Sequence, residues 1–409
     1  MSDRRTFVII GGGMAGAKAA ESLRAEGYDD RLVLVTAEPE LPYERPPLSK
    51  SYLAGESSAA DARVHEEAFY AEHDVELLTG REATRLDPGA HRVELDDGSS
   101  VEYERLLIAT GAIPRRPRIE GADQPGVHVL RTIADSDALR EVLTEGARLA
   151  IIGAGWIGCE VAASARGRGA EVTLFEQAGA PLEAVLGLEL GAFFARLHRS
   201  HGVDLVTGAS VAAIEAGPRV RLGDGSTVDC DAILLGVGVA PATALAEAAG
   251  LEIENGIVCD ERLRTSAPDV FAAGDVAFHL HPRYGRRIRV EHWANAGDQG
   301  SYVGKSMLGG EEPYAALPFF FSDQYDLGLE YLGLHTADDR LVTRGDVDGA
   351  QFQAFWVGGD GRVTAGMHVN DWDATDPIRR LLERDVPVDE RQLADANVPL
   401  DEIGTDGAG

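Results

Sequence analysis

The sequence predicts an α/β protein in which one strand–turn–helix unit occurs twice. A short apolar run leads into a G-x-G-x-x-G segment at residue 11 and again at residue 153. Each glycine segment precedes a stretch predicted to be helical and then a second apolar run. Each unit is followed by short alternating segments with Asp-Gly turns, which indicate a small antiparallel meander.

The first unit starts with the apolar run 7–10, which is typical of a buried parallel strand. Gly11, Gly13 and Gly16 follow it. In such a motif the first glycine permits the turn, the second lets a pyrophosphate approach the backbone, and the third lets the helix pack on the strand. The helix N-terminus then offers unpaired N–H groups to the phosphates. A single motif of this kind also fits a glycine-rich turn without a ligand.

An acidic residue stands where a dinucleotide ribose would need it. The next predicted strand covers residues 32–35, and Glu38 lies 22 residues past Gly16. A carboxylate at this spacing accepts hydrogen bonds from a ribose 2′-hydroxyl. The first unit therefore predicts a dinucleotide site.

The second unit repeats the pattern with Gly153, Gly155 and Gly158, and Glu176 follows its second strand. Two complete units make coincidence improbable and predict two dinucleotides on one polypeptide. No Arg or Lys occurs in residues 177–181, and a 2′-phosphate would be repelled by Glu176. The second site therefore favours NADH over NADPH.

The segment between and after the units suggests a duplicated architecture. Hairpin turns are predicted at Asp97-Gly98 and Asp224-Gly225, each before an apolar strand. A further buried strand, 270–273, ends at Gly274 and Asp275. Asp275 is suited to bind sugar-like hydroxyls of a cofactor, and a helix N-cap is the compatible alternative.

Composition narrows the class of protein. The 409 residues suggest two or three domains, and the formal charge of −30 argues against general binding to nucleic acid or to anionic membranes. No apolar run approaches the roughly 18 residues of a membrane span, and the first one is too short for an export signal. Cys159, Cys230 and Cys259 are widely spaced and are predicted to be buried apolar residues. We therefore expect a cytoplasmic protein.

Several stretches together resemble the FAD-dependent pyridine nucleotide–disulfide oxidoreductase superfamily, and within it the NADH-dependent ferredoxin reductases of oxygenase systems, kin to putidaredoxin and rubredoxin reductases. The glycine segments "GGGMAGA" and "GAGWIGCEVA" give the superfamily. "PYERPPLSK" and "VEHWANA" narrow it to the subfamily. Further matching stretches are "LLIATGA", "VTLFEQ", "GVGVAP", "VFAAGDV" and "FFSDQYD".

The resemblance implies two Rossmann-like dinucleotide-binding domains of the glutathione reductase type and a C-terminal α/β domain. It places an FAD domain at residues 1–113 and 245–314, an NAD domain at 114–244 and the C-terminal domain at 315–409. The runs "LGLEYLG" and "FQAFWV" are predicted strands of that last domain, and the tail 401–409 is expected to be poorly ordered.

The resemblance also assigns roles to side chains. Arg45 would contact the adenine or pyrophosphate half of FAD, and Lys50 would reach the flavin ring with Glu160 as its counter-charge. Trp293 and Glu291 would lie at the flavin and nicotinamide. Cofactor contacts of less weight are implied for Ala15, Ala83, Thr110, Gly111, Arg131, Ile157, Gly236 and Gly238. This sequence departs from the family pattern at Ala184, where an arginine is common, and at Phe321, where a tryptophan is common.

The function implied is hydride transfer from NADH to FAD, then transfer of single electrons to a [2Fe–2S] ferredoxin, or a rubredoxin, that serves an oxygenase. The segment "PYERPPLSK" holds no cysteine, so a thiol–disulfide relay is not expected there. Arg283, Arg286, Arg287 and Arg289 form a basic cluster suited to an acidic ferredoxin, whereas a solvated hairpin is the simpler alternative. Two rival functions remain at this stage: a flavin reductase of a small oxidant, and an NADH-sensing flavoprotein of the apoptosis-inducing-factor type.

Overall fold

The computed structural model describes residues 5–404, and the last five residues of the predicted tail lie outside this range. The chain divides into two compact units, and each is built from separate segments. Unit 1 comprises residues 1–47, 57–113 and 239–316, and unit 2 comprises residues 48–56, 114–238 and 317–409. None of the described helices combines the length and apolarity needed to cross a membrane.

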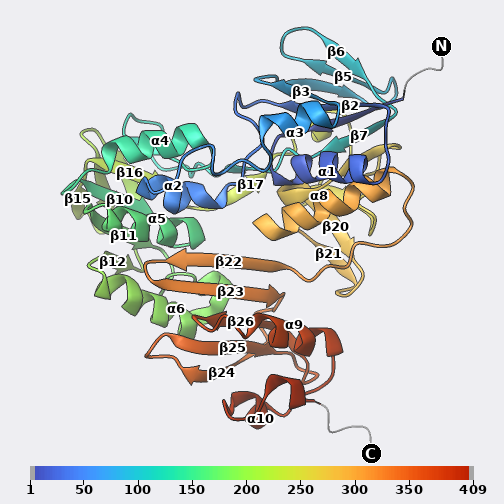
Figure 1. Ribbon diagram of the computed structural model, residues 1–409. Helices are drawn as coiled ribbons and strands as arrows, with labels where there is room; N and C mark the ends of the chain where they lie inside the picture. Colours follow the sequence, from blue (N-terminus) through green and yellow to red (C-terminus); the bar gives the residue numbers. More distant parts are fainter. Residues whose placement is uncertain (1–4, 405–409) are drawn as a thin grey trace, which may run out of the picture. The chain divides into compact units, whose positions relative to one another are not determined.

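Unit 1 is organised around a five-stranded parallel sheet of order β19-β7-β1-β2-β3 (Figure 1). Its strands are β1 (Thr6–Ile10), β2 (Arg31–Thr36), β3 (Val75–Thr79), β7 (Arg105–Ile108) and β19 (Val270–Ala272). The predicted strands at 7–10, 32–35 and 270–273 therefore form, with ends that differ by one residue. Successive residues of each strand point to opposite faces of this sheet, and both faces are buried. Val8 and Val33 belong to one core cluster, whereas Phe7 and Leu32 belong to another.

Helices and two small sheets complete unit 1. The helices are α1 (Met14–Ala25), α3 (Glu67–Glu72), α7 (Ala244–Ala248), η2 (Gly274–Val276) and α8 (Trp293–Met307). One meander is β4 (Ala83–Asp87), β5 (Arg92–Leu95) and β6 (Ser100–Glu102), with the Asp97-Gly98 turn between its last two strands as predicted. A second small sheet is β18 (Ile257–Cys259), β20 (Ala277–His281) and β21 (Arg286–Ile288). Strands β8 (Ala112–Pro114) and β17 (Val239–Pro241) pair where the chain leaves and re-enters the unit.

Helices α1 and α8 lie side by side, and small residues allow the close contact (Figure 1). A Cβ added to Gly300 would lie 2.4 Å from the carbonyl oxygen of Ala15, and one added to Gly304 would lie 2.6 Å from Ser22 Oγ. Ser22 Oγ also donates to the carbonyl of Ser301 at 2.6 Å. Helix α8 is thus fixed against the helix that begins at the first glycine loop.

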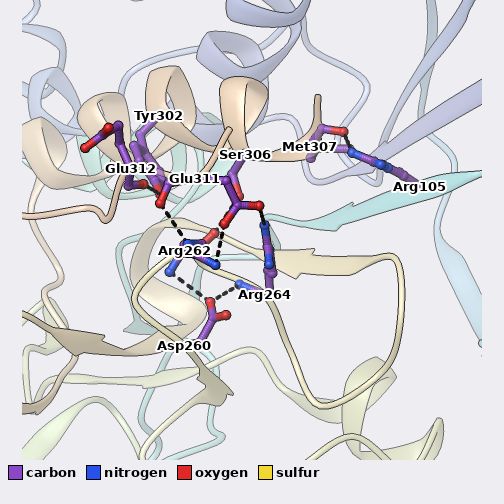
Figure 2. Close-up of polar contacts among 9 residues, drawn as sticks. All are labelled: Arg105, Asp260, Arg262, Arg264, Tyr302, Ser306, Met307, Glu311 and Glu312. Carbon is purple, nitrogen blue, oxygen red and sulfur yellow. Dashed lines mark hydrogen bonds and ion pairs between the residues drawn. The ribbon is translucent and has the colours of Figure 1, made fainter. Parts of the chain in front are cut away.

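Polar contacts hold the C-terminal end of α8 (Figure 2). Arg262 lies 2.7 Å from the carboxylate of Glu311, and Ser306 Oγ donates to the carbonyl of Arg262 at 2.8 Å. The side chain of Arg105 donates to the carbonyl of Met307, the last residue of the helix. These contacts fix the C-terminal end of α8, the helix that begins at Trp293.

Unit 2 repeats the central sheet of unit 1 with the order β12-β11-β10-β16-β9. Its members are β9 (Val127–His128), β10 (Arg148–Ile152), β11 (Glu171–Glu176), β12 (Asp204–Thr207) and β16 (Ala232–Leu235), and all pair in parallel. The associated helices are η1 (Pro46–Ser49, which starts in unit 1), α2 (Ser51–Ala54), α4 (Ile133–Val142), α5 (Trp156–Gly167) and α6 (Glu183–Ser200). The meander β13 (Val211–Glu215), β14 (Arg219–Leu222) and β15 (Thr227–Asp229) matches that of unit 1, with its turn at the predicted Asp224-Gly225. The predicted duplication is confirmed.

The remainder of unit 2 is a five-stranded antiparallel sheet with helices. Its order is β22-β23-β26-β25-β24, and the predicted runs "LGLEYLG" and "FQAFWV" form β23 and β25. The elements are β22 (Phe319–Gln324), β23 (Leu327–Gly333), β24 (Arg340–Asp346), β25 (Gln351–Val357), β26 (Val363–Val369), α9 (Thr375–Arg384), α10 (Glu390–Ala394) and η3 (Leu400–Glu402). The predicted α/β fold class is confirmed.

Candidate functional site

The first glycine loop contains glycines required for two different reasons. Gly11 has φ +119°, and a Cβ there would lie 2.1 Å from the carbonyl oxygen of Ala109. A Cβ on Gly16 would lie 2.0 Å from the carbonyl oxygen of Gly11. At Gly13, no atom of the described chain is within 4 Å of the added Cβ. Gly11 and Gly16 are therefore needed by the fold, whereas Gly13 faces open space beside the start of α1.

The second loop shows the same division. A Cβ on Gly153 would lie 2.5 Å from the carbonyl oxygen of Gly236, and one on Gly158 would lie 2.0 Å from that of Gly153. The added Cβ of Gly155 again meets no described atom within 4 Å. Ile157, in the first turn of α5, keeps 42% of its surface exposed.

Gly13 and Gly155 are the N-cap residues of α1 and α5, and neither cap supplies a side-chain acceptor. The first N–H groups of both helices therefore remain available to a ligand. An open glycine, a helix N-terminus and room for a bulky anion fit a dinucleotide pyrophosphate at each loop.

Glu38, the predicted ribose contact of the first loop, lies in a polar cluster of unit 1. Its carboxylate accepts hydrogen bonds from Tyr43 and from Arg45 Nη2, the latter at 2.5 Å. Burial alone would lower the pKa of Arg45, but its hydrogen bond to Glu38 and the charges of Tyr43, Glu38 and Asp275 raise it. Tyr43 was not singled out from the sequence, although it belongs to the quoted "PYERPPLSK".

Gly274, the neighbour of Asp275 in the sequence, lies against the start of α1. Gly274 has φ +79°, and a Cβ there would be 3.2 Å from the Cβ of Ala15 in α1. Its N–H donates to Gln299 Oε1 at 2.8 Å, a contact with no signal in the sequence. Asp275 lies within η2, and the N-cap position that the sequence left open for it belongs to Ala273.

Glu176 is held beside the second glycine loop by the backbone. Its two carboxylate oxygens accept the N–H groups of Ala154 at 2.7 Å and Ala178 at 2.8 Å. The carboxylate is therefore fixed at the end of β11 next to Gly155. This position suits a ribose with free hydroxyls and would repel a 2′-phosphate.

Lys50 and Glu160 form a buried ion pair within unit 2, with Lys50 Nζ 2.8 Å from Glu160 Oε2. Glu160 projects from α5, one turn beyond Trp156 at the helix start. It also accepts hydrogen bonds from Ser49 Oγ at 2.5 Å and Ser322 Oγ at 2.7 Å. Both serines were missed in the sequence, although they stand in the quoted "PYERPPLSK" and "FFSDQYD".

The ion pair also affects the pKa of a second carboxylate, that of Asp323. Burial raises the pKa of Asp323, the charge of Lys50 opposes that rise, and the charge of Glu160 adds to it. The ring of Phe321 lies 5.5 Å from Lys50 Nζ, at the position where the family commonly has tryptophan. The environment of Lys50 is thus partly set by β22.

Other predicted residues have mainly structural contacts in their own units. Thr110 Oγ1 donates to the carbonyl of Ala242, and the N–H of Ala242 donates to the carbonyl of Gly111. Both residues therefore hold the segment at which the chain re-enters unit 1. Glu291 binds the side chain of Arg289. Trp293 is the first residue of α8. Burial raises the pKa of Glu44, and the side chain of Trp293 opposes this rise.

Three further predicted residues lie apart from these clusters or only border them. Ala83 starts β4 and packs on the core of unit 1. Arg131 donates its backbone N–H to Asp135 at the start of α4. Gly238 has φ +88° and follows Gly236, which borders the second glycine loop.

The sequence matches a model of the pyridine nucleotide-disulphide oxidoreductase family over residues 5–300. The chain belongs to this family. A second model, described as reductase C-terminal, matches residues 319–404 of the same oxidoreductase. The resemblance inferred from the motifs is therefore confirmed.

Named relatives of this oxidoreductase extend over nearly the whole chain. The anthranilate 1,2-dioxygenase system ferredoxin–NAD(+) reductase component of Burkholderia cepacia is 40% identical over 403 residues, covering 96% of this chain and 98% of that protein. Putidaredoxin reductase of Pseudomonas putida is 36% identical, covering 98% of this chain and 97% of its own. A chain in the crystal structure of the covalent putidaredoxin reductase–putidaredoxin complex has a TM-score of 0.92 and 35% identity, covering 98% of both chains.

Proposed function

We propose that this protein is an NADH-dependent ferredoxin reductase with FAD as its resident cofactor. The observation that carries the proposal is the pair of glycine loops with open glycines, Gly13 and Gly155, on one chain whose relatives are ferredoxin–NAD(+) reductases. The overall reaction converts NADH and two oxidised ferredoxins into NAD+, two reduced ferredoxins and one proton. The ferredoxin, of the [2Fe–2S] type, or a rubredoxin would then serve an oxygenase such as a cytochrome P450 or a ring-hydroxylating dioxygenase.

The residues of unit 1 would hold FAD through the first glycine loop, with Glu38, Arg45 and Asp275 at its polar groups. Bound FAD supplies the two-electron to one-electron conversion that neither NADH nor a ferredoxin provides alone. The residues of unit 2 would hold NADH through the second glycine loop and Glu176. The domain limits proposed are 1–113 with 245–314 for FAD, 114–244 for NAD and 315–409 for the C-terminal domain.

Lys50 and Glu160 are the proposed catalytic residues. The ammonium of Lys50 offsets negative charge that develops during reduction, and Glu160 keeps this buried cation in place. A buried lysine without such a partner would lose its charge readily. Three groups contact the carboxylate of Glu160: the ammonium of Lys50 and the hydroxyls of Ser49 and Ser322.

The proposed partner surface is the β20–β21 hairpin of unit 1. Arg286 and Arg287 are exposed there, in a chain of formal charge −30. Negative proteins repel one another in general, so an acidic ferredoxin needs a local positive patch to approach. We also place the protein in the cytoplasm as part of this proposal, because a reducing compartment suits its three free, buried cysteines.

Anaerobic stopped-flow spectroscopy tests the function. NADH should bleach the absorbance of bound FAD, and an oxidised [2Fe–2S] ferredoxin should restore it within milliseconds to seconds, with two ferredoxins reduced per NADH. The two rival functions give other results. Reoxidation by a small oxidant but not by ferredoxin would favour the first, and a long-lived complex with NAD that ignores ferredoxin would favour the NADH sensor.

A further inference from the structure

The buried face of β22 packs on α5 in a register that brings Ser322 to Glu160. Phe320 and Ser322 share this face, because alternate residues of a strand point the same way. Phe320 makes an edge contact with Trp156, with ring centroids 4.8 Å apart. Two residues along the strand and one turn along the helix cover similar distances, about 6 Å each, so Ser322 meets Glu160.

The Ser322 hydroxyl is directed at the carboxylate. Ser322 is 1% exposed, and its Oγ lies 2.7 Å from Glu160 Oε1. Gln324, on the same face, donates its Nε2 to Ser322 Oγ at 3.4 Å. Because the oxygen accepts from Gln324, the single hydroxyl proton is left for Glu160.

Ser322 occupies the carboxylate oxygen that the ion pair does not use. Lys50 and Ser49 both contact Oε2, whereas Oε1 is contacted by Ser322. A carboxylate bound on both oxygens cannot rotate without breaking a hydrogen bond. A buried oxygen left without a donor would be unfavourable.

We propose that Ser322 of the C-terminal domain is a positioning residue for the catalytic pair, acting through Glu160. This inference rests on the proposed function of Lys50 and Glu160. The segment matched at residues 319–404 would then contribute to hydride transfer indirectly, because β22 as well as α5 holds the pair.

A matched pair of variants isolates the hydroxyl. Ser322→Thr keeps it and Ser322→Val has nearly the same shape without it, so both add similar bulk to the strand. Ser322→Val should slow flavin reduction by NADH about tenfold relative to Ser322→Thr, with the KM for NADH unchanged. Ser306→Ala, which removes a buried hydroxyl bonded to a backbone carbonyl in unit 1, should leave both the rate and the KM unchanged.

Thermal unfolding of the holoprotein gives a readout independent of turnover. Ser322→Thr should be more stable than Ser322→Val, because valine leaves Glu160 Oε1 without its donor. In a Glu160→Gln background this difference should shrink, since the charge-assisted hydrogen bond is already lost. A difference of the same size in both backgrounds would indicate packing alone and would overturn the proposal.

The result separates this inference from the proposed function. If Glu160→Gln leaves hydride transfer unchanged, the function of the pair is wrong. If Glu160→Gln slows hydride transfer but Ser322→Val matches Ser322→Thr in both rate and stability, the pair is catalytic and the role of Ser322 is refuted.

Discussion

Lys50 and Glu160, 110 residues apart in the sequence, form a buried ion pair with an N–O distance of 2.8 Å. In addition to its contact with the ammonium, the carboxylate of Glu160 accepts hydrogen bonds from the hydroxyls of Ser49 and Ser322. This contact joins the proline-rich segment "PYERPPLSK" to α5, the helix of the second glycine motif. The ion pair holds the side chain of Lys50 in one position.

Loss of one charge from this pair should impair hydride transfer more than cofactor binding. Glu160→Gln preserves the shape and should slow reduction by NADH about 10- to 100-fold, because Lys50 loses its fixed counter-charge. FAD content, measured from the flavin absorbance of the purified protein, should remain near one per chain. An equal loss of FAD and of rate would indicate a structural role instead.

The open glycines should be separable from those that the fold needs. Gly13→Ala should give a folded protein without FAD, because φ is −91° and its Cβ meets no described atom within 4 Å. Gly155→Ala should remain yellow but fail to be reduced by NADH. Gly16→Ala and Gly158→Ala are the comparison, since their Cβ atoms would lie 2.0 Å from backbone oxygens and should prevent normal folding. Circular dichroism and flavin absorbance distinguish the two classes, and a yellow, NADH-reducible Gly155→Ala would contradict the assignment.

Glu176 should set the preference for NADH. Glu176→Ser removes the carboxylate that the N–H groups of Ala154 and Ala178 hold in place. We expect kcat/KM for NADH to fall about tenfold. The ratio of kcat/KM for NADH to kcat/KM for NADPH should also decrease, since the repulsion of a 2′-phosphate is lost. Glu171→Ala, an exposed change at the start of the same strand, should leave the ratio unaltered.

Charge reversal on the β20–β21 hairpin should affect the partner but not the nucleotide. Arg286→Glu with Arg287→Glu should lower ferredoxin turnover at low salt about tenfold or more, because steering is lost. NADH-to-dye turnover should not change. The matched control reverses Arg81 and Arg85, which pair with acidic residues of the β4–β6 meander region in the same unit. An equal effect of both double variants would show a dependence on net charge alone.

Buried histidines should make the protein sensitive to acid. Burial lowers the pKa of His198 to about 4 from 6.5, so the folded state resists a proton that the unfolded state accepts. Stability therefore falls as the pH drops below about 6.5, and this residue alone should cost about 2 kcal/mol of unfolding free energy at pH 5. His198→Gln should reduce the decline in the free energy of unfolding between pH 7 and pH 5, as measured by urea unfolding. His73→Gln, at an exposed position, should leave the slope as it is in the unaltered protein.

The sequence predicted most of what depends on short segments. Apolar runs, glycine spacing and Asp-Gly turns specify local backbone geometry, so the β1–α1 and β10–α5 units and both meanders were found with small errors at strand ends. The repeated sheet order follows from that duplication. The pairing of Lys50 with Glu160 came from the resemblance and not from any pattern in this chain.

Contacts between distant segments could not be obtained in this way. Ser322 meets Glu160 only because β22 lies on α5 in one register, and Gln299 meets Gly274 only because α8 packs on α1. Serine and glutamine are common in ordinary strands and helices, so their presence in the sequence gives no indication of a buried hydrogen bond. Tyr43 was within a quoted motif, but its bond to Glu38 depends on the turn between them.

The segment 48–56 belongs to unit 2 although unit 1 surrounds it in the chain. Leu53 is fully buried in a cluster that also contains Leu139 and Leu143. During synthesis on the ribosome this segment must wait for more than a hundred later residues, roughly 5 to 20 s at ordinary elongation rates, before its core exists. A fragment cut at residues 114 and 238 would lack Leu53 and Lys50 altogether. A circularly permuted or fused version that restores this segment is needed if the second nucleotide unit is to be produced alone.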